Sequence, residues 1–181
     1  FHQELISGRY QEVLKYLDNR KITKKEIHYF KIGYAASDNN FYEKLIKEFD
    51  EKSIISSGIY YFDENRKKYV DRFRNRIIFP IKSLNNLVFA LGGRAFSKQA
   101  LAKYVNSPET EFYKKGNNLY NINKAKEFRN ENNEAFIVEG YLDVISLHKF
   151  GISNVVANLG TAITEKQINL IWSFFKNAII C

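Results

Sequence analysis

Hydrophobic residues in the last third of the chain follow two spacings in alternation. Residues 135–138 are a short apolar run, and beyond Gly140 the apolar residues recur three to four apart until Gly151. Strands that alternate with helices of this length are typical of right-handed βαβ units and a small Rossmann-like parallel sheet. The pattern predicts strands at 135–138, 154–157 and 177–181, and helices at 142–150 and 164–175.

The first 130 residues have a different order, with amphipathic helices first and strands afterwards. Thr23 and Glu26 form a capping-box signature for one of these helices. The fold class is therefore an α+β N-terminal subdomain, with helices and then an antiparallel sheet, followed by a partial α/β unit. The polar cluster 130–133 suggests a division into residues 1–130 and 131–181. Predicted helices lie at 9–20, 23–30, 41–49, 52–57 and 121–129, and predicted strands at 59–62, 68–70, 71–81, 87–91 and near 103–106.

Charge is distributed unevenly along the chain. Residues 59–130 hold 15 of the 28 Lys and Arg residues but only 6 of the 20 acidic ones. Residues 131–181 are slightly acidic, with 5 acidic residues against 3 basic ones. A basic middle beside an acidic end predicts a polyanion-binding surface next to a cation site. A solvated basic face without a partner would give the same counts.

Two carboxylates fall where the first parallel strand ends. Glu139 follows that strand directly, and Asp143 lies in the first turn of the next helix. Ligands of open α/β sheets gather at the carboxyl ends of the strands. The pair is therefore a candidate for binding a divalent cation or transferring protons. A surface glutamate with no chemical role fits the pattern equally well.

Cations recur in the middle third at spacings that suggest a binding surface. If residues 71–81 are extended, Arg72, Arg74 and Arg76 share one face of a strand, about 7 Å apart at each step. Arg94 follows two glycines that permit close approach of a ligand to the backbone. A β-bulge explains the same glycine pair.

Several motifs together resemble the catalytic core of bacterial DnaG-type primases. Glu139-Gly-Tyr-Leu-Asp143 and Asn158-Leu-Gly-Thr-Ala162 resemble the Toprim portion of that family. Four further motifs resemble the family's N-terminal core subdomain: Phe30-Lys-Ile-Gly-Tyr-Ala35, Asp71-Arg-Phe-Arg-Asn-Arg76, Gly92-Gly-Arg94 and Lys103-Tyr-Val-Asn-Ser-Pro-Glu-Thr110. The motifs stand in the family's order and span the whole chain.

The resemblance implies a DNA-directed RNA polymerase that makes short RNA primers on single-stranded DNA for replication, by metal-dependent nucleotidyl transfer. Its partners would be the template, ribonucleoside triphosphates and the RNA primer. Glu139 would be a catalytic residue and a ligand of Mg²⁺ or Mn²⁺, with Asp143 in support. The candidates for nucleic-acid or nucleotide binding are Arg72, Arg74, Arg76, Arg94, Lys103, Tyr104, Asn106, Ser107 and Lys115.

The family pattern extends beyond both ends of this sequence. Its remaining acidic metal ligands are expected beyond Cys181. Zinc is expected only in an N-terminal domain, and the replicative helicase is expected to bind a C-terminal domain. We therefore expect the 181 residues alone to be inactive in primer synthesis.

Two other classes stay open: another Toprim enzyme of the topoisomerase or nuclease type, and a non-catalytic module that binds single-stranded nucleic acid. No membrane association is expected, because no apolar run approaches the roughly 20 residues of a membrane span. The single cysteine fits a reducing compartment. Together with the resemblance, the single cysteine predicts a location in the cytoplasm of a bacterium or in a bacterium-derived organelle.

Overall fold

The computed structural model describes residues 1–37, 41–97, 100–128, 133–160 and 162–181. The chain opens with three short helices, α1 (His2–Ile6), α2 (Gln11–Asn19) and α3 (Lys24–Phe30), followed by strand β1 (Gly33–Ala35). The predicted capping box begins α3, because Thr23 N–H donates to Glu26 Oε2 at 2.8 Å and the Thr23 side chain accepts from the backbone. Lys31, in the left-handed region at φ 54°, ends this helix.

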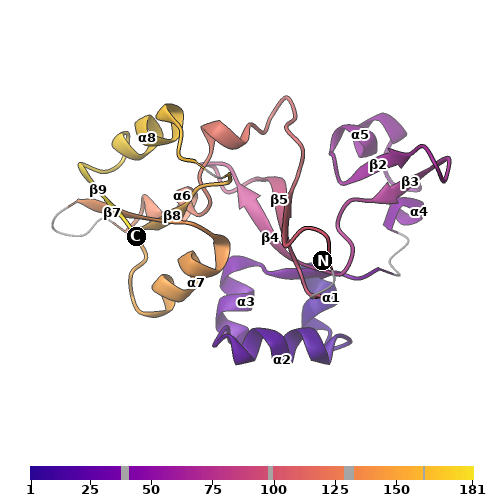
Figure 1. Cartoon of the computed structure of the whole chain (residues 1–181), viewed down its shortest axis with the longest axis horizontal. Helices are drawn as coiled ribbons and strands as arrows, with labels where there is room; N and C mark the ends of the chain where they lie inside the picture. The colour runs from indigo at the N-terminus through magenta and orange to yellow at the C-terminus, as the bar shows by residue number, and fades with distance from the viewer. Residues whose placement is uncertain (38–40, 98–99, 129–132, 161) are drawn as a thin grey trace.

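A small helix-and-hairpin lobe follows and lies at one end of the molecule (Figure 1). It contains α4 (Phe41–Leu45), α5 (Glu51–Ser56), β2 (Tyr60–Asp63) and β3 (Lys68–Asp71). The two strands pair antiparallel from Tyr60 opposite Asp71 to Asp63 opposite Lys68, which confirms the predicted hairpin.

A four-stranded antiparallel sheet forms the middle of the molecule. Its strands β4 (Arg76–Lys82), β5 (Val88–Ala95) and β6 (Tyr104–Asn106) join β1 in the order β1-β4-β5-β6. Helices α1, α2 and α3 lie together below this sheet in Figure 1.

The predicted arginine ridge of Arg72, Arg74 and Arg76 is wrong. The segment before Arg76 is a bend and not a strand. Asn75 adopts a left-handed conformation at φ 51°, and Phe73 is buried, so the side chains do not alternate across a sheet. The three arginines consequently do not share one face of a strand.

The C-terminal residues form the predicted parallel sheet. Its strands are β7 (Glu134–Val138), β8 (Val155–Ala157) and β9 (Asn177–Ile180), in the order β8-β7-β9, and its helices are α7 (Tyr141–Lys149) and α8 (Glu165–Trp172). Successive side chains of β7 pack on opposite faces: Phe136 and Val138 join one hydrophobic cluster with α7, and Ala135 and Ile137 join another with α8. A 3₁₀ turn and a short helix lead into this unit. They are η1 (Lys115–Asn117) and α6 (Ile122–Ala125).

One hydrophobic cluster runs through both parts of the chain. It includes Leu5 and Leu17 from the first helices, Phe79 from β4, and Tyr141 and Val144 from α7. The fold class predicted from the sequence is confirmed. The predicted boundary at residues 130 and 131 lies outside the described residues. No helix among the described residues has the length and apolarity needed to cross a bilayer.

Candidate nucleic-acid and metal site

A cleft of about 780 Å³ lies between the antiparallel sheet and the start of α7. One wall comes from the end of α2 and from β5 and β6. The other comes from the segment between β7 and α7 and from the loop after β8, which are the carboxyl ends of two parallel strands. The polar and charged residues that line it are Arg20, Arg94, Lys103, Tyr104 and Asn106 on the first wall, and Glu139, Tyr141, Asp143 and Asn158 on the second.

The acidic wall is built by the change from strand to helix. Glu139 is exposed directly after β7, and Asp143 is exposed in the first turn of α7. The Asp143 side chain folds back toward Gly140, where an ideal Cβ would lie 3.3 Å from Asp143 Oδ2. An acid in this turn also stabilises the helix N-terminus, so its position alone does not require a ligand.

The basic wall is a stack of alternating cations and tyrosines. The Arg94 guanidinium lies 5.1 Å from the Tyr16 ring centroid and 5.9 Å from that of Tyr104. Arg20 lies over Tyr16 at 5.0 Å, and Lys103 Nζ lies 5.8 Å from the Tyr104 ring. Each ring therefore attracts two cations through its negative face, which keeps three like charges close together.

Arg94 is the most enclosed cation of this stack, with 7% of its surface exposed. Its Nη1 donates to Ala95 O at 3.2 Å, and its Nε has no hydrogen-bond partner among the described residues. The ion pairs formed within the described part of the chain do not include Arg94, Arg20 or Lys103. A buried guanidinium without a carboxylate partner is suited to binding an external anion.

Asn106 connects the two walls. Tyr141 Oη donates to Asn106 Oδ1 at 2.6 Å, and Asn106 Nδ2 donates to Leu159 O at 2.9 Å. The Tyr141 ring is stacked on Phe79, with centroids 5.0 Å apart and planes 6° apart. Burial raises the pKa of Tyr141 well above its usual value, so the hydroxyl keeps the proton that it donates.

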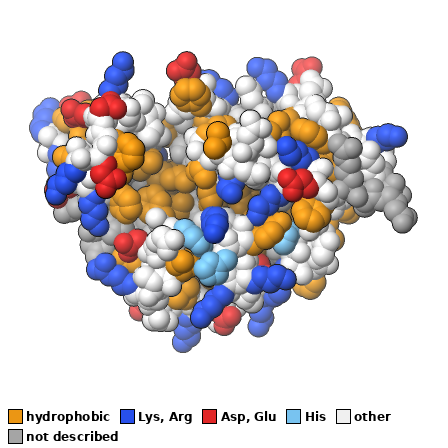
Figure 2. Space-filling view, turned by 180° about the vertical axis from the view of Figure 1, so that it is seen from behind, with side chains coloured by type: hydrophobic (Ala, Val, Ile, Leu, Met, Phe, Trp, Pro, Cys, Tyr) orange, Lys and Arg blue, Asp and Glu red, His pale blue; other side chains and the backbone are white. Residues whose placement is uncertain are grey.

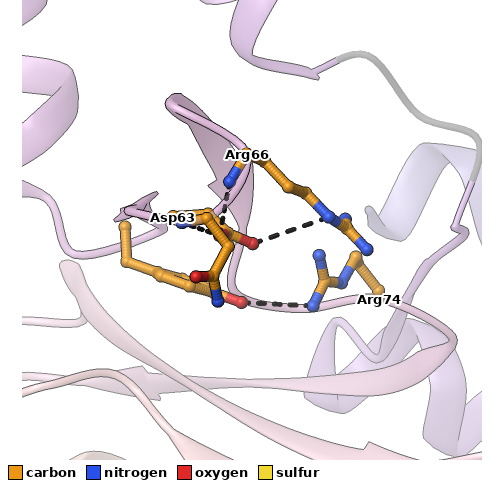
Figure 3. Close-up of polar contacts among 5 residues, drawn as sticks. Asp63, Arg66 and Arg74 are labelled. Atoms are coloured by element: carbon orange, nitrogen blue, oxygen red, sulfur yellow. Dashed lines mark hydrogen bonds and ion pairs between the residues drawn. The ribbon is translucent and has the colours of Figure 1, made fainter.

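Two of the predicted site residues lie with the hairpin and not in the cleft. Arg72 Nε donates to Gly58 O at 2.8 Å, and its guanidinium lies 5.6 Å from the Tyr61 ring. Arg74 Nη2 donates to the Tyr61 hydroxyl at 3.3 Å. Figure 3 shows Arg74 beside Arg66, which forms a 3.6 Å ion pair with Asp63. These arginines thus help to join the hairpin lobe to the sheet.

Three more predicted site residues also lie outside the cleft lining. Arg76 is half-buried, and burial, with the nearby Arg74, lowers the pKa of its guanidinium. Ser107 is 2% exposed and its Oγ accepts from Leu91 N–H at 2.9 Å, which extends the pairing of β6 with β5. Lys115 begins η1, and its carbonyl accepts from the side chain of Gln167 at 3.0 Å.

Arg20 and Asn158 were not predicted as site residues, yet both line the cleft. Arg20 follows the last turn of α2 and has no sequence signal beyond its charge. Asn158 follows β8, and its buried Oδ1 lacks a hydrogen-bond partner among the described residues. Its position directly after a parallel strand was the one signal in the sequence that could have predicted Asn158 as a site residue.

The described residues contain no group of three or more His, Cys, Asp and Glu side chains able to hold one metal ion. Glu139 and Asp143 still provide the oxygen donors that Mg²⁺ prefers, and Mg²⁺ sites commonly use one or two carboxylates with water and phosphates. On the face shown in Figure 2, Lys and Arg side chains are interspersed with acidic and hydrophobic ones and do not form a single patch.

A parallel sheet with exposed acids at its carboxyl edge, facing cations from an antiparallel sheet, is the arrangement of a protein with a Toprim-like unit. Comparison with protein families agrees with this assignment. Residues 1–126 match the N-terminal domain of the DNA primase catalytic core, and residues 133–181 match the Toprim domain.

Individual relatives and solved structures give the same result. The DNA primase of Clostridium acetobutylicum is 40% identical over 168 residues, covering 92% of this chain and 28% of the relative. The DNA primase of Aquifex aeolicus is 36% identical over 183 residues, and the match covers 99% of this chain and 36% of the relative. A DnaG primase catalytic domain bound to single-stranded DNA superposes with a TM-score of 0.89 at 33% identity, covering all of this chain and 58% of that one. The E. coli primase catalytic core superposes with a TM-score of 0.90 at 33% identity, again covering all of this chain and 58% of that one.

The chain belongs to the DnaG-type DNA primase family. It spans about a quarter to a third of the length of these curated relatives. The resemblance found in the sequence motifs is confirmed.

Proposed function

We propose that this chain is the template-binding and metal-binding part of an enzyme that synthesises RNA primers on single-stranded DNA. One observation carries the proposal: the cleft places Glu139 and Asp143 opposite Arg94, Lys103 and Tyr104, in a chain of the primase family. Nucleotidyl transfer requires carboxylates for a divalent cation and positive charge for phosphates, and the two walls provide these separately.

The acidic wall would bind Mg²⁺ or Mn²⁺ through Glu139, with Asp143 as the supporting oxygen donor. The cation, when bound, neutralises charge on the phosphates that react. Glu139 is exposed after β7, so its carboxylate is free to approach an ion in the cleft. The family relationship supports a divalent metal in general, and the choice of Mg²⁺ or Mn²⁺ is part of our proposal.

The basic wall would bind the template backbone and the triphosphate of a ribonucleotide. Arg94, Lys103 and Arg20 provide phosphate contacts, which are independent of base sequence and weaken with salt. Tyr104, 42% exposed, provides a ring on which a base can stack. We keep Asn106, Ser107, Lys115, Arg72, Arg74 and Arg76 as weaker candidates for nucleic-acid contacts, since these side chains are already engaged within the chain or lie outside the cleft.

Two further parts of the proposal rest on the family alone. We propose that residues 1–130 act as the basic template-binding subdomain and residues 131–181 as part of the Toprim subdomain. The bacterial relatives support a cytoplasmic location. A topoisomerase-like or nuclease-like activity is not favoured, because residues 1–126 match the primase core. The predicted helicase and zinc interactions concern other segments and stay predictions.

The decisive experiment is Glu139→Gln in the protein that carries this chain. The change keeps the size of the side chain and removes its charge. Primer synthesis is expected to fall by at least about 100-fold, as is typical for loss of a metal-binding or acid–base group. Affinity for a single-stranded oligonucleotide, measured by fluorescence anisotropy, is expected to stay within about 2-fold, because phosphate contacts come from the opposite wall.

The matched control is Glu111→Gln, an exposed acid outside the cleft lining. It removes the same charge and should leave both measurements unchanged. Primer synthesis that survives in the Glu139→Gln protein would refute the role of Glu139 and, with it, the proposed function of the cleft.

A further inference from the structure

We propose that Asn106 and Tyr141 form a latch that holds the two walls of the cleft in one fixed register. Asn106 is then a positioning residue whose side chain acts through Tyr141 and Leu159. The inference rests on the proposed function for its consequences in catalysis, but the latch itself is a feature of the fold.

The first observation is the use of the Asn106 carboxamide. Its oxygen accepts from the Tyr141 hydroxyl and its nitrogen donates to Leu159 O, so one side chain of β6 connects to two separate segments of the acidic wall. These partners lie 35 and 53 residues away along the chain. An amide that uses a donor and an acceptor at once fixes the orientation of both partners.

The second observation is how firmly Tyr141 is held. It is 5% exposed, stacked on Phe79 and in edge contact with Tyr120 at 4.8 Å. Gly92 of β5 makes room for it, since a Cβ at that position would collide with the Tyr141 hydroxyl. A buried ring with one bonded hydroxyl is a rigid anchor for the backbone that follows.

The third observation is the place of Tyr141 between the two carboxylates. Glu139 lies two residues before it and Asp143 two residues after it, and both side chains are exposed while Tyr141 is buried. Fixing Tyr141 therefore fixes the backbone that carries the acidic pair. Because the same Asn106 is on β6, two residues after Tyr104, the acidic pair is held relative to the basic wall.

Links that do not involve Asn106 also join residues 1–130 to the rest of the chain. Tyr120 pairs with Ala157 in an isolated bridge, and Lys149 Nζ donates to Lys21 O at 2.9 Å. These links and the shared hydrophobic cluster keep the parts joined when the latch is cut. Loss of the latch should thus loosen the cleft without unfolding the protein.

Tyr141→Phe tests this inference with the smallest change, the removal of one oxygen atom. Tyr113→Phe is its matched control, because Tyr113 is also buried but its hydroxyl has no hydrogen-bond partner among the described residues. Spin labels at Lys15→Cys on α2 and Lys166→Cys on α8, in a Cys181→Ser background, report the distance between the two sides of the molecule.

The distance distribution is expected to broaden in Tyr141→Phe and in Asn106→Ala, and to match the parent in Tyr113→Phe. Equal widths in Tyr141→Phe and Tyr113→Phe would overturn the latch. This measurement needs no primase activity, so it is decided separately from the Glu139→Gln experiment.

Kinetics of primer synthesis in the protein that carries this chain give the second readout. Tyr141→Phe and Asn106→Ala are expected to lower kcat by about 10-fold to 100-fold, as displacement of catalytic groups by about 1 Å does, while KM for the nucleotide changes little. A direct contact between Asn106 and the nucleotide predicts a different split: Asn106→Ala raises KM, and Tyr141→Phe has no effect. That result would overturn the positioning role.

Discussion

Gly92 packs against the cleft residue Tyr141, and it is the position at which the smallest substitution should have the clearest effect. It lies in β5 with both neighbouring strands paired to it, opposite Phe79 on β4 and Asn106 on β6. In a Gly92→Ala protein the added methyl group would collide with Oη and Cζ of Tyr141 and lie 2.7 Å from its Cε2. Ordinary contacts begin near 3.4 Å, so the ring would have to move by roughly 1 Å.

Tyr141 has little freedom to move. Its ring is stacked on Phe79, with the planes 6° apart, and its hydroxyl is bonded to Asn106 at 2.6 Å. Overpacking of a core costs about 1–3 kcal/mol, and loss of the hydrogen bond about 1 kcal/mol. The reduced entropy of the unfolded chain returns about 0.4–1 kcal/mol. We therefore expect a loss of about 1–3 kcal/mol in the free energy of unfolding.

Urea denaturation followed by circular dichroism measures this loss directly, and thermal melts should show a fall of roughly 3–10 °C for a chain of this size. Gly160→Ala is the control, because a Cβ there would meet nothing within 4 Å. It should stay within about 0.5 kcal/mol of the parent protein. A Gly92→Ala protein as stable as Gly160→Ala would show that Tyr141 can rearrange freely, which would contradict the rigid anchor inferred from its packing.

Three further predictions concern other parts of the molecule. Arg94→Lys keeps the charge but loses the planar guanidinium, so the Kd for single-stranded DNA should rise about 3-fold to 10-fold in anisotropy titrations, and an unchanged Kd would remove Arg94 from the binding wall. Burial raises the pKa of Asp71 to about 6 from an ordinary value near 3.8, so the folded state binds the extra proton and stability falls as pH rises between these values. Asp71→Asn should abolish that part of the pH dependence in denaturation curves, and a persisting slope would assign it to another group. Thr23→Ala should lower stability by about 1 kcal/mol through loss of the capping box with Glu26, whereas no loss would mean that α3 is held by packing alone.

Local signals in the sequence were sufficient to predict most of the elements. The capping box at Thr23 and the change from an apolar run to helical spacing at Gly140 depend on residues a few positions apart, and both features are present. Strand β1 and helix α1 were not predicted, because three and five residues are too few to show a period.

The arginine ridge failed because alternation of residue types does not determine backbone conformation. Arg72, Arg74 and Arg76 alternate as they would in a strand, yet Asn75 takes a left-handed conformation and the chain bends before β4 begins. Asparagine is among the residues that adopt this conformation at low cost. The sequence thus contained a reason for the bend, but the alternating arginines suggested the opposite.

The latch was beyond sequence reasoning for a different reason. Gly92, Asn106 and Tyr141 come from three segments, and their relation appears only once β5, β6 and α7 are packed together. The glycine pair 92–93 suggested close approach of a ligand, whereas the space beside these glycines is filled by the rings of Tyr141 and Phe73. The approach of a ligand stays a prediction, and the groups that do approach these glycines are side chains of the chain itself.

Arg94 lies in the basic middle of the sequence and has no ion-pair partner among the described residues. A buried arginine is normally neutralised by a carboxylate, but the acidic residues of the cleft lining stand on the opposite wall. Within the described residues, the rings of Tyr16 and Tyr104 lie near the guanidinium in place of that carboxylate. Aromatic faces attract a cation without cancelling its charge, so the guanidinium keeps its capacity to bind an anion that enters the cleft. A carboxylate placed next to Arg94 would stabilise the isolated chain but would compete with phosphate. The contacts of Arg94 with Tyr16 and Tyr104, in place of an internal ion pair, therefore support the phosphate contact that we propose for this arginine.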